Sequence, residues 1–306
     1  MSLLVVGSVA YDTIKTPQGE VVEALGGAAV YFSLAAGLFM PVRLVGVVGD
    51  DFRGADLDLL SDRSVDVSGL ERVHGGRTFR WTGEYSQDMN SRETLSVELN
   101  VFENFKPKVP QAFRNSRFVF LANAPPVTQM SVLDQMDRPD FVMADTMDLW
   151  IQTAHKDLLG LLRRIDGLLV NDSEAMLLTE RHNVIQAGRA IQDLGPSRVV
   201  IKKGEHGAIL FDGDHIVPLP AYPIVSVKDP TGAGDSFAGA LMGYLACSVG
   251  ARGGLAVEPR VFKQALGHGA VVASLTCEDF GVRRIAAASK AEVKERFAQY
   301  REFLSL

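Results

Sequence analysis

The residues best suited to chemistry form a short glycine-rich segment, Asp229-Pro230-Thr231-Gly232-Ala233-Gly234-Asp235, followed by an apolar stretch from Ser236 to Cys247. Small residues let backbone N–H groups point into one concavity, and the N-terminus of the following helix adds partial positive charge. We therefore expect Gly232, Ala233 and Gly234 to hold phosphate oxygens. Asp235 lies at the edge of that concavity, where it can take a proton from a substrate hydroxyl. The segment thus predicts phosphoryl transfer, although an aspartate before a helix is also a common cap.

A second pair of polar residues could hold a metal ion. Asn171 and Glu174 follow the predicted strand Gly167 to Val170, and their spacing places both side chains on one face of a helical turn. Oxygen ligands beside a phosphate suit Mg²⁺, often through water. The alternative is an ordinary helix start, in which Asp172 or Ser173 caps the helix and Glu174 completes the turn.

The segment from Asp229 to Asp235 resembles the C-terminal signature of the ribokinase-like (PfkB) carbohydrate kinase family. Agreement in order and spacing extends over nearly the whole chain: Gly7-Ser8 with Asp12, Gly26-Gly27, Val45 to Asp51, Asn171 to Glu174, and Lys202 to Gly207. The resemblance implies an ATP-dependent kinase that phosphorylates a hydroxyl of a sugar or nucleoside-like molecule. It also implies a three-layer α/β/α fold with a mainly parallel central sheet and a small β-sheet lid.

The resemblance further implies which residues meet ATP and metal ions. Asn171 and Glu174 would serve Mg²⁺ and phosphate, and Asp229 would order the turn around a monovalent cation such as K⁺. The nucleotide would lie near Lys202, Gly204, Gly207, Thr231 and His268, with His268 as a wall of the adenine pocket. The alternatives are a solvated lysine, a plain turn between two strands at the glycines, and a histidine on a helix surface.

The acceptor site is expected beside the first strand. Asp12 could accept hydrogen bonds from vicinal hydroxyls, and Gly26 and Gly27 would let substrate hydroxyls approach the backbone. Asn123, after the strand Arg117 to Leu121, points toward the same rim. The alternative for Asp12 is a residue of a turn or of the lid base.

The chain departs from a ribose kinase on the substrate side. Ala10 stands where an asparagine is common, and Ala28 and Tyr31 follow Gly27 where polar residues are usual. An apolar and aromatic rim suits a larger or flatter substrate such as a nucleoside. The rim would comprise Tyr31 with Phe79, Trp81 or Tyr85, although these aromatics could equally form the lid core. Arg80 and Arg92 in the lid could recognise an anionic group, so a sugar phosphate or an inositol is an alternative acceptor.

The elements that must position these residues are short β-branched runs separated by helical stretches. The runs are Leu3 to Val6, Arg43 to Val48, Arg117 to Leu121, Phe141 to Ala144, Gly167 to Val170 and Arg198 to Ile201. This rhythm predicts βαβ units and a mainly parallel sheet covered on both faces. Ligands of such sheets bind beyond the carboxyl ends of the strands, so polar residues after each run are the candidates.

Two segments interrupt this rhythm, at about 11–24 and 74–101. Leu95, Val97, Leu99 and Val101 alternate with polar residues, which predicts a small antiparallel sheet that projects from one domain spanning residues 1–306. Such a sheet could close over the site as a lid and exclude water, or could pair with a second copy in a homodimer.

Composition restricts the function classes. The net charge of -6 with dispersed lysine and arginine argues against nucleic acid as a partner. Two isolated cysteines do not make a disulfide framework, and no apolar stretch spans a bilayer, so we expect a cytoplasmic protein without membrane partners. Gly7-Ser8-Val9-Ala10 lacks a dinucleotide fingerprint, which argues against an oxidoreductase. A non-catalytic ligand sensor or scaffold of the same fold is the remaining alternative, against which the intact Asp235 counts.

Overall fold

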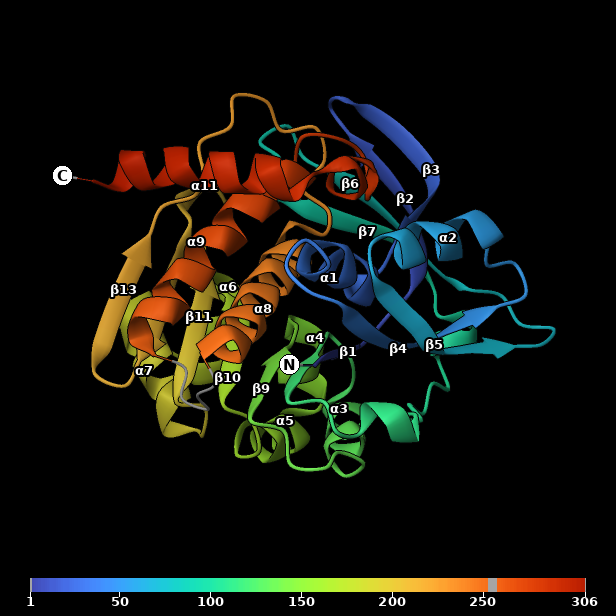
Figure 1. Cartoon of the computed structure of the whole chain (residues 1–306), viewed down its shortest axis with the longest axis horizontal. Coiled ribbons are helices and arrows are strands. Elements are labelled where there is room, and N and C mark those ends of the chain that lie inside the picture. Colours follow the sequence, from blue (N-terminus) through green and yellow to red (C-terminus); the bar gives the residue numbers. More distant parts are fainter. Residues whose placement is uncertain (1, 253–257, 306) are drawn as a thin grey trace.

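A computed structural model describes residues 2–252 and 258–305 of the chain. Within these residues, nine strands form one large sheet in the order β13-β12-β11-β10-β9-β8-β1-β4-β5 (Figure 1). Their bounds are β1 Leu3–Val6, β4 Val42–Gly49, β5 Val65–Val73, β8 Phe118–Leu121, β9 Phe141–Asp145, β10 Gly167–Asn171, β11 Arg198–Lys202, β12 Ala208–Asp212 and β13 His215–Leu219. Neighbouring strands from β11 to β5 are parallel, and β12 and β13 add an antiparallel edge. The predicted α/β/α fold with a mainly parallel sheet is confirmed.

The central strands are apolar throughout because the sheet is buried on both faces. In β1, Leu3 and Val5 face one hydrophobic core, whereas Leu4 and Val6 face the other. A strand that alternates between two cores needs apolar side chains at every position. The six predicted runs therefore agree with the observed strands to within one residue at each end.

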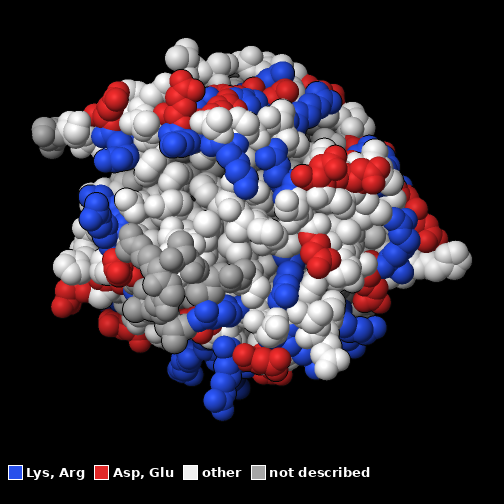
Figure 2. All heavy atoms as spheres, in the orientation of Figure 1, with Lys and Arg blue, Asp and Glu red and all other residues white. Residues whose placement is uncertain are grey.

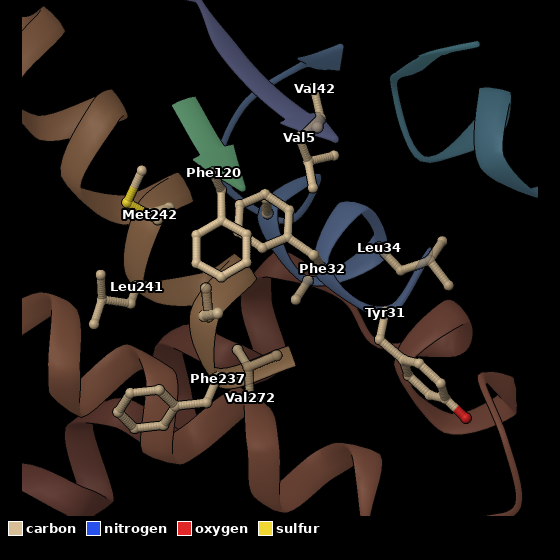
Figure 3. Close-up of a cluster of buried hydrophobic side chains, with 14 of the residues drawn as sticks. Val5, Tyr31, Phe32, Leu34, Val42, Phe120, Phe237, Leu241, Met242 and Val272 are labelled. Carbon is tan, nitrogen blue, oxygen red and sulfur yellow. The ribbon is translucent and has the colours of Figure 1, made fainter. Parts of the chain in front are cut away.

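Helices cover both faces of the large sheet. The face that includes the cluster in Figure 3 is covered by α1 Ala28–Ala36, α2 Gly54–Asp62, α8 Ala233–Arg252, α9 Pro259–Thr276, α10 Arg283–Ala287 and α11 Lys290–Leu304. The other face is covered by α3 Pro126–Leu133, α4 Asp148–Thr153, α5 His155–Leu162, α6 Asp172–Thr179 and α7 Val184–Asp193. Short 3₁₀ turns are η1 Asn100–Phe102, η2 Gln111–Phe113 and η3 Gly204–His206. In the first core, Phe32 of α1 stacks on Phe120 of β8 with 4.5 Å between ring centroids.

A separate four-stranded sheet, here called the lid, lies at one side of the molecule (Figure 1). It comprises β2 Ala10–Thr16, β3 Gly19–Gly26, β6 Phe79–Tyr85 and β7 Arg92–Glu98, in the order β3-β2-β6-β7. The predicted antiparallel pairing is found between β2 and β3 and between β6 and β7, whereas the two central strands, β2 and β6, pair in parallel. Both strands follow parallel strands of the large sheet, β1 and β5, so the chain enters the lid twice from the same side. Every residue of β7 is exposed, and neither of its faces is buried.

The helix behind the glycine-rich segment begins earlier than predicted. We expected it from Ser236, but α8 begins at Ala233, so Asp235 lies inside its first turn. Gly232 precedes the helix with a φ of 74°. Because a positive φ is open to glycine and strained for other residues, the chain can turn there and start the helix at once.

The charge distribution on the surface and the character of the helices concern possible nucleic-acid and membrane partners. On the face drawn in Figure 2, basic and acidic side chains are interspersed among uncharged residues. Among the described residues, no helix combines the length and the apolar character needed to cross a bilayer.

Candidate active site

The glycine-rich turn is ordered by Asp229, whose side chain is fully buried. Its Oδ1 accepts a hydrogen bond from the Thr231 N–H and its Oδ2 accepts one from the Gly281 N–H, both at 2.8 Å. The ring of Tyr31 packs against Gly232, where a Cβ atom would lie 2.3 Å from the ring carbons. The turn is therefore held from both sides, and glycine at position 232 is required by space as well as by φ.

Asp235 lies half-buried in the first turn of α8, at the carboxyl end of the large sheet. Burial raises the pKa of its carboxyl to about 7, Asp145 adds to the increase, and Lys202 and Arg92 oppose it. A carboxyl with a pKa near neutrality is well matched to accept a proton at physiological pH. One residue earlier, Gly234 has no side chain, which leaves room for the ammonium group of Lys202.

The ammonium group of Lys202 lies against this turn. A Cβ atom on Gly234 would be 3.1 Å from Lys202 Nζ, and the same Nζ is 3.4 Å from Oδ2 of the buried Asp145. Asp145 and Glu174 raise the pKa of Lys202 against the effect of burial, which keeps it charged. Asp145 was not among the predicted site residues, although it directly follows the predicted strand Phe141 to Ala144, at the end where ligands of such sheets bind.

Asp12 lies on β2 at the base of the lid, with 4% of its surface exposed. The Gly27 N–H donates to its carboxyl, and burial raises the pKa of that carboxyl to about 7, with Asp229 and Asp235 adding to the increase. A Cβ atom on Gly26 would lie 1.9 Å from Asp12 Oδ2. Asp12, Gly26 and Gly27 therefore lie together at the base of the lid, and Asp235 acts electrostatically on Asp12. The predicted substrate contacts of these residues stay predictions.

Asn171 and Glu174 form a capping box at the start of α6. Asn171 Oδ1 accepts from the Glu174 N–H at 2.7 Å, and Glu174 Oε2 accepts from the Asn171 N–H at 2.8 Å. The cap is Asn171 and not Asp172 or Ser173. Burial, followed by Asp145, raises the pKa of Glu174 to about 7. Within residues 2–252 and 258–305, no group of three His, Cys, Asp or Glu side chains is arranged to hold a metal ion.

The predicted turn between β11 and β12 is present and touches the lid. Gly204 and Gly207 have φ of 54° and 88°, and a Cβ on Gly207 would lie 2.1 Å from the Leu219 carbonyl oxygen. At the tip of the lid, Asn90 Nδ2 donates to Glu205 Oε1 in this turn at 3.3 Å.

A second lid contact reaches the glycine-rich turn. Thr231 Oγ1 donates to Tyr85 Oη at 3.1 Å, so the end of β6 is tied to the residue before Gly232. The other lid aromatics are core, as the alternative interpretation held. Phe79 stacks on Phe102, and Trp81 packs against the cluster of Ile14, Val21 and Phe280.

The two lid arginines differ in their surroundings. Arg80 pairs with Glu23 at 3.0 Å and with Asp51 at 2.8 Å, which assigns it to the lid framework. Arg92 lies with its guanidinium carbon 5.3 Å from the centroid of the Trp81 ring and lowers the pKa values of Asp12 and Asp235.

Asn123 and His268 have their side chains engaged with other parts of the fold. Asn123 Oδ1 accepts from Trp150 Nε1 at 2.9 Å, and its Nδ2 lies 3.1 Å from Met147 Sδ. His268 is 8% exposed and stacks on Phe297 with 3.8 Å between ring centroids. Burial lowers its pKa to about 4, so it is neutral at pH 7. The predicted substrate and adenine contacts of these residues stay predictions.

Comparison with known proteins gives a consistent result. The family described as pfkB family carbohydrate kinase matches residues 2–288. The chain is 31% identical over 252 residues to a cytidine kinase of Thermococcus kodakarensis, which covers 80% of this chain and 88% of that protein. It is 26% identical over 264 residues to a nucleoside kinase of Methanothermobacter thermautotrophicus, covering 79% and 82%.

Solved structures share the fold. A nucleoside kinase of Burkholderia thailandensis in complex with inosine superposes with a TM-score of 0.79 at 19% identity, covering 98% of each chain. A nucleoside kinase of Methanocaldococcus jannaschii superposes with a TM-score of 0.77 at 20% identity, covering 98% of this chain and 99% of that one.

Proposed function

This chain belongs to the pfkB family of carbohydrate kinases, and from that premise we propose that it transfers the γ-phosphoryl group of ATP to a sugar hydroxyl of a nucleoside. Membership makes it an ATP-dependent phosphotransferase with an alcohol as acceptor. The observation that carries the residue assignment is that Asp12 and Asp235 stand on different elements, yet Asp235 lies near enough to Asp12 for its charge to raise the pKa of the Asp12 carboxyl. The nucleoside is supported by the cytidine kinase and nucleoside kinase relatives.

Asp235 is the general base in this proposal. An ionised carboxylate at the start of α8 accepts the proton of the attacking hydroxyl as the O–P bond forms. Asp12 accepts hydrogen bonds from other hydroxyls of the acceptor and thereby orients it. Gly26 leaves room for the Asp12 carboxyl itself, and the Gly27 N–H donates to that carboxyl and holds it in place.

The turn from Gly232 to Gly234 is the anion hole. The N–H groups of Gly232 and Gly234 and the N-terminus of α8 stabilise charge that develops on the transferred phosphoryl group, whereas the Ala233 N–H donates to the Pro230 carbonyl oxygen at 3.2 Å. Lys202, already beside Gly234, adds a full positive charge to the same place. Asp145 holds this ammonium group in position until phosphate competes for it.

ATP would lie along the β11–β12 turn, and Asn171 and Glu174 would hold Mg²⁺ beside its phosphates. The donor set near that turn fits Mg²⁺, since Glu174 offers a carboxylate and Asn171 an amide oxygen, both suited to contacts through water. Bound Mg²⁺ would neutralise phosphate charge. Asp229 already has both oxygens hydrogen-bonded to backbone N–H groups, so K⁺ is left out of the proposal.

The test is Mg²⁺-dependent ADP release across a panel of nucleosides, sugars, sugar phosphates and inositols. We expect turnover with at least one nucleoside, and release of ADP that depends on the acceptor. Turnover with a sugar, sugar phosphate or inositol alone would refute the nucleoside assignment. ATP binding without stimulation by any acceptor would favour a ligand sensor.

The pH dependence follows from the two raised pKa values. Asp235 acts as a base only when it is ionised, and its pKa is about 7. We expect kcat/KM to rise with pH up to about 7 and then to level off, with a slope of log kcat/KM between about 1 and 2 below pH 6 because Asp12 titrates in the same range. Initial rates from about pH 5 to pH 9 measure this; a profile that is flat across pH 7 would contradict the role of Asp235.

We further propose that the lid closes over the acceptor within a single kinase domain. The contacts Tyr85–Thr231 and Asn90–Glu205 tie its end and its tip to the two turns that serve the phosphates. The double variant Tyr85→Phe with Asn90→Ala should raise ATP hydrolysis without acceptor several-fold relative to kinase turnover, because water enters a looser site. Ser96→Ala, on the exposed strand β7, is the control and should change neither rate. An unaltered ratio in the double variant would show that the contacts do not seal the site.

A further inference from the structure

Tyr31 contributes a buried hydroxyl that no part of the described chain satisfies. The residue is 1% exposed, and its Oη has no hydrogen-bond partner among residues 2–252 and 258–305. Its ring extends from α1 and packs against Gly232. In Figure 3 the hydroxyl points away from the labelled apolar cluster while neighbouring side chains of α1, Phe32 and Leu34, belong to the core. Since buried hydroxyls are almost always hydrogen-bonded, this one calls for an explanation.

The surroundings of the Tyr31 hydroxyl are the proposed acceptor site. Asp12, Asp229, Tyr85 and Asp235 all act electrostatically on it and, together with burial as the largest cause, raise its pKa well above 10. The phenol is therefore neutral and has a proton to donate. Ionised carboxylates only accept hydrogen bonds, so the site combines acceptors with one uncommitted donor.

Tyr31 and Asp12 are mechanically connected through the start of α1. The Gly27 N–H donates to the Asp12 carboxyl, and the Gly27 carbonyl oxygen accepts from the Tyr31 N–H at 3.2 Å. Gly27 thus connects the backbone of Tyr31 to the Asp12 carboxyl. A rigid donor and a rigid acceptor on one support are suited to a ligand group that both donates and accepts, which is what an alcohol does.

We propose that Tyr31 is a specificity residue whose hydroxyl donates to the oxygen of a ribose hydroxyl that in turn donates to Asp12. The inference rests on the proposed function. It identifies the vicinal diol of a ribonucleoside as the group that the site recognises. A deoxynucleoside lacks one of these hydroxyls and leaves Tyr31 Oη unpaired, so the enzyme discriminates against it. Binding requires the lid to open first, because the Tyr31 hydroxyl is fully buried.

The experiment compares Tyr31→Phe with the wild type on cytidine, 2′-deoxycytidine and 3′-deoxycytidine, and on the same three forms of any other nucleoside that is turned over. Loss of one neutral hydrogen bond should lower kcat/KM for the ribonucleoside about fivefold to tenfold, mainly through KM. With one of the two deoxy forms, the substitution should have no effect, because that form lacks the hydroxyl that Tyr31 contacts. Tyr244→Phe is the matched control: its hydroxyl bonds to Gln264 at 3.1 Å between α8 and α9, and its removal should leave the ratio unchanged.

Thermal unfolding gives a second readout. Because Tyr31 Oη has no partner in the described chain, Tyr31→Phe should unfold at the same temperature as the wild type or higher. A clear decrease in Tm would show that the hydroxyl bonds to the protein and would overturn the inference. An equal loss of kcat/KM on all three nucleosides would also overturn the inference, because it would indicate an effect through the Gly232 turn. The absence of a loss on any of the three would overturn it as well. A wild type that turns over no nucleoside would instead refute the proposed function itself.

Discussion

Replacement of Asp235 with asparagine is expected to lower kcat by about 10²–10⁴-fold. Asparagine keeps the size and hydrogen-bonding shape of the side chain but cannot take the proton of the acceptor hydroxyl. ATP affinity should change little, because the turn amides and Lys202 remain in place. The measurement is steady-state ADP release with the best acceptor, together with equilibrium binding of ATP.

The control for this prediction is Asp157→Asn. Asp157 also lies in the first turn of a helix, α5, but is exposed on the face of the sheet opposite α8. It should be as active as the wild type. An Asp235→Asn variant with more than about a tenth of wild-type kcat would contradict the assignment of Asp235 as the base.

The Asp235→Asn variant should lose activity but not stability. The folded pKa of Asp235, about 7, lies above the ordinary value of 3.8, so the contribution of this group to stability is present at low pH and is lost as pH rises through 7. At about pH 8 the wild type holds a charged carboxylate in a site that disfavours it. Asp235→Asn should therefore unfold at the same or a higher temperature there, which separates lost chemistry from lost folding.

Substitution of Gly232 by alanine is the second large expected effect. Gly232 has a φ of 74°, and an added Cβ atom would lie 2.3 Å from the ring carbons of Tyr31. The turn must shift, and its N–H groups then no longer point at the transferred phosphoryl group. We expect kcat to decrease by about 10²–10³-fold and the free energy of unfolding to decrease by about 1–3 kcal/mol.

Gly213→Ala separates backbone strain from the clash. Gly213 also has a positive φ, 53°, but nothing lies within 4 Å of a Cβ atom at that position. It joins β12 to β13, away from the turn. This variant should lose stability from strain alone and keep full activity. Equal activity of the Gly232 and Gly213 variants would refute the anion-hole role of the turn.

The fold could be predicted largely from the sequence because its signals are local. Leu3 to Val6 is apolar at every position, as a strand buried on both faces must be, and the spacing of such runs predicts helical crossovers. Asp229, the glycines and Asp235 are close together in the chain, so a common role could be proposed for them without a structure. The order of the lid strands could not be predicted, because residue periodicity predicts a strand but does not show which strand pairs with it. The parallel pair of β2 and β6 was missed for that reason.

The sequence by itself determined the family, the strand-end location of the site and the candidate base, because each depends on residues close together in the chain. The tertiary structure decided which distant side chains surround that base. Lys202 and Asp145 are 57 positions apart and Tyr85 and Thr231 are 146 apart, yet each pair is within hydrogen-bonding distance. The sequence suggested that Tyr31 is part of an aromatic rim, whereas folding packs its ring against Gly232 and leaves its hydroxyl without a hydrogen-bond partner among the described residues. Contacts of this kind arise from packing between elements, and no local spacing encodes them.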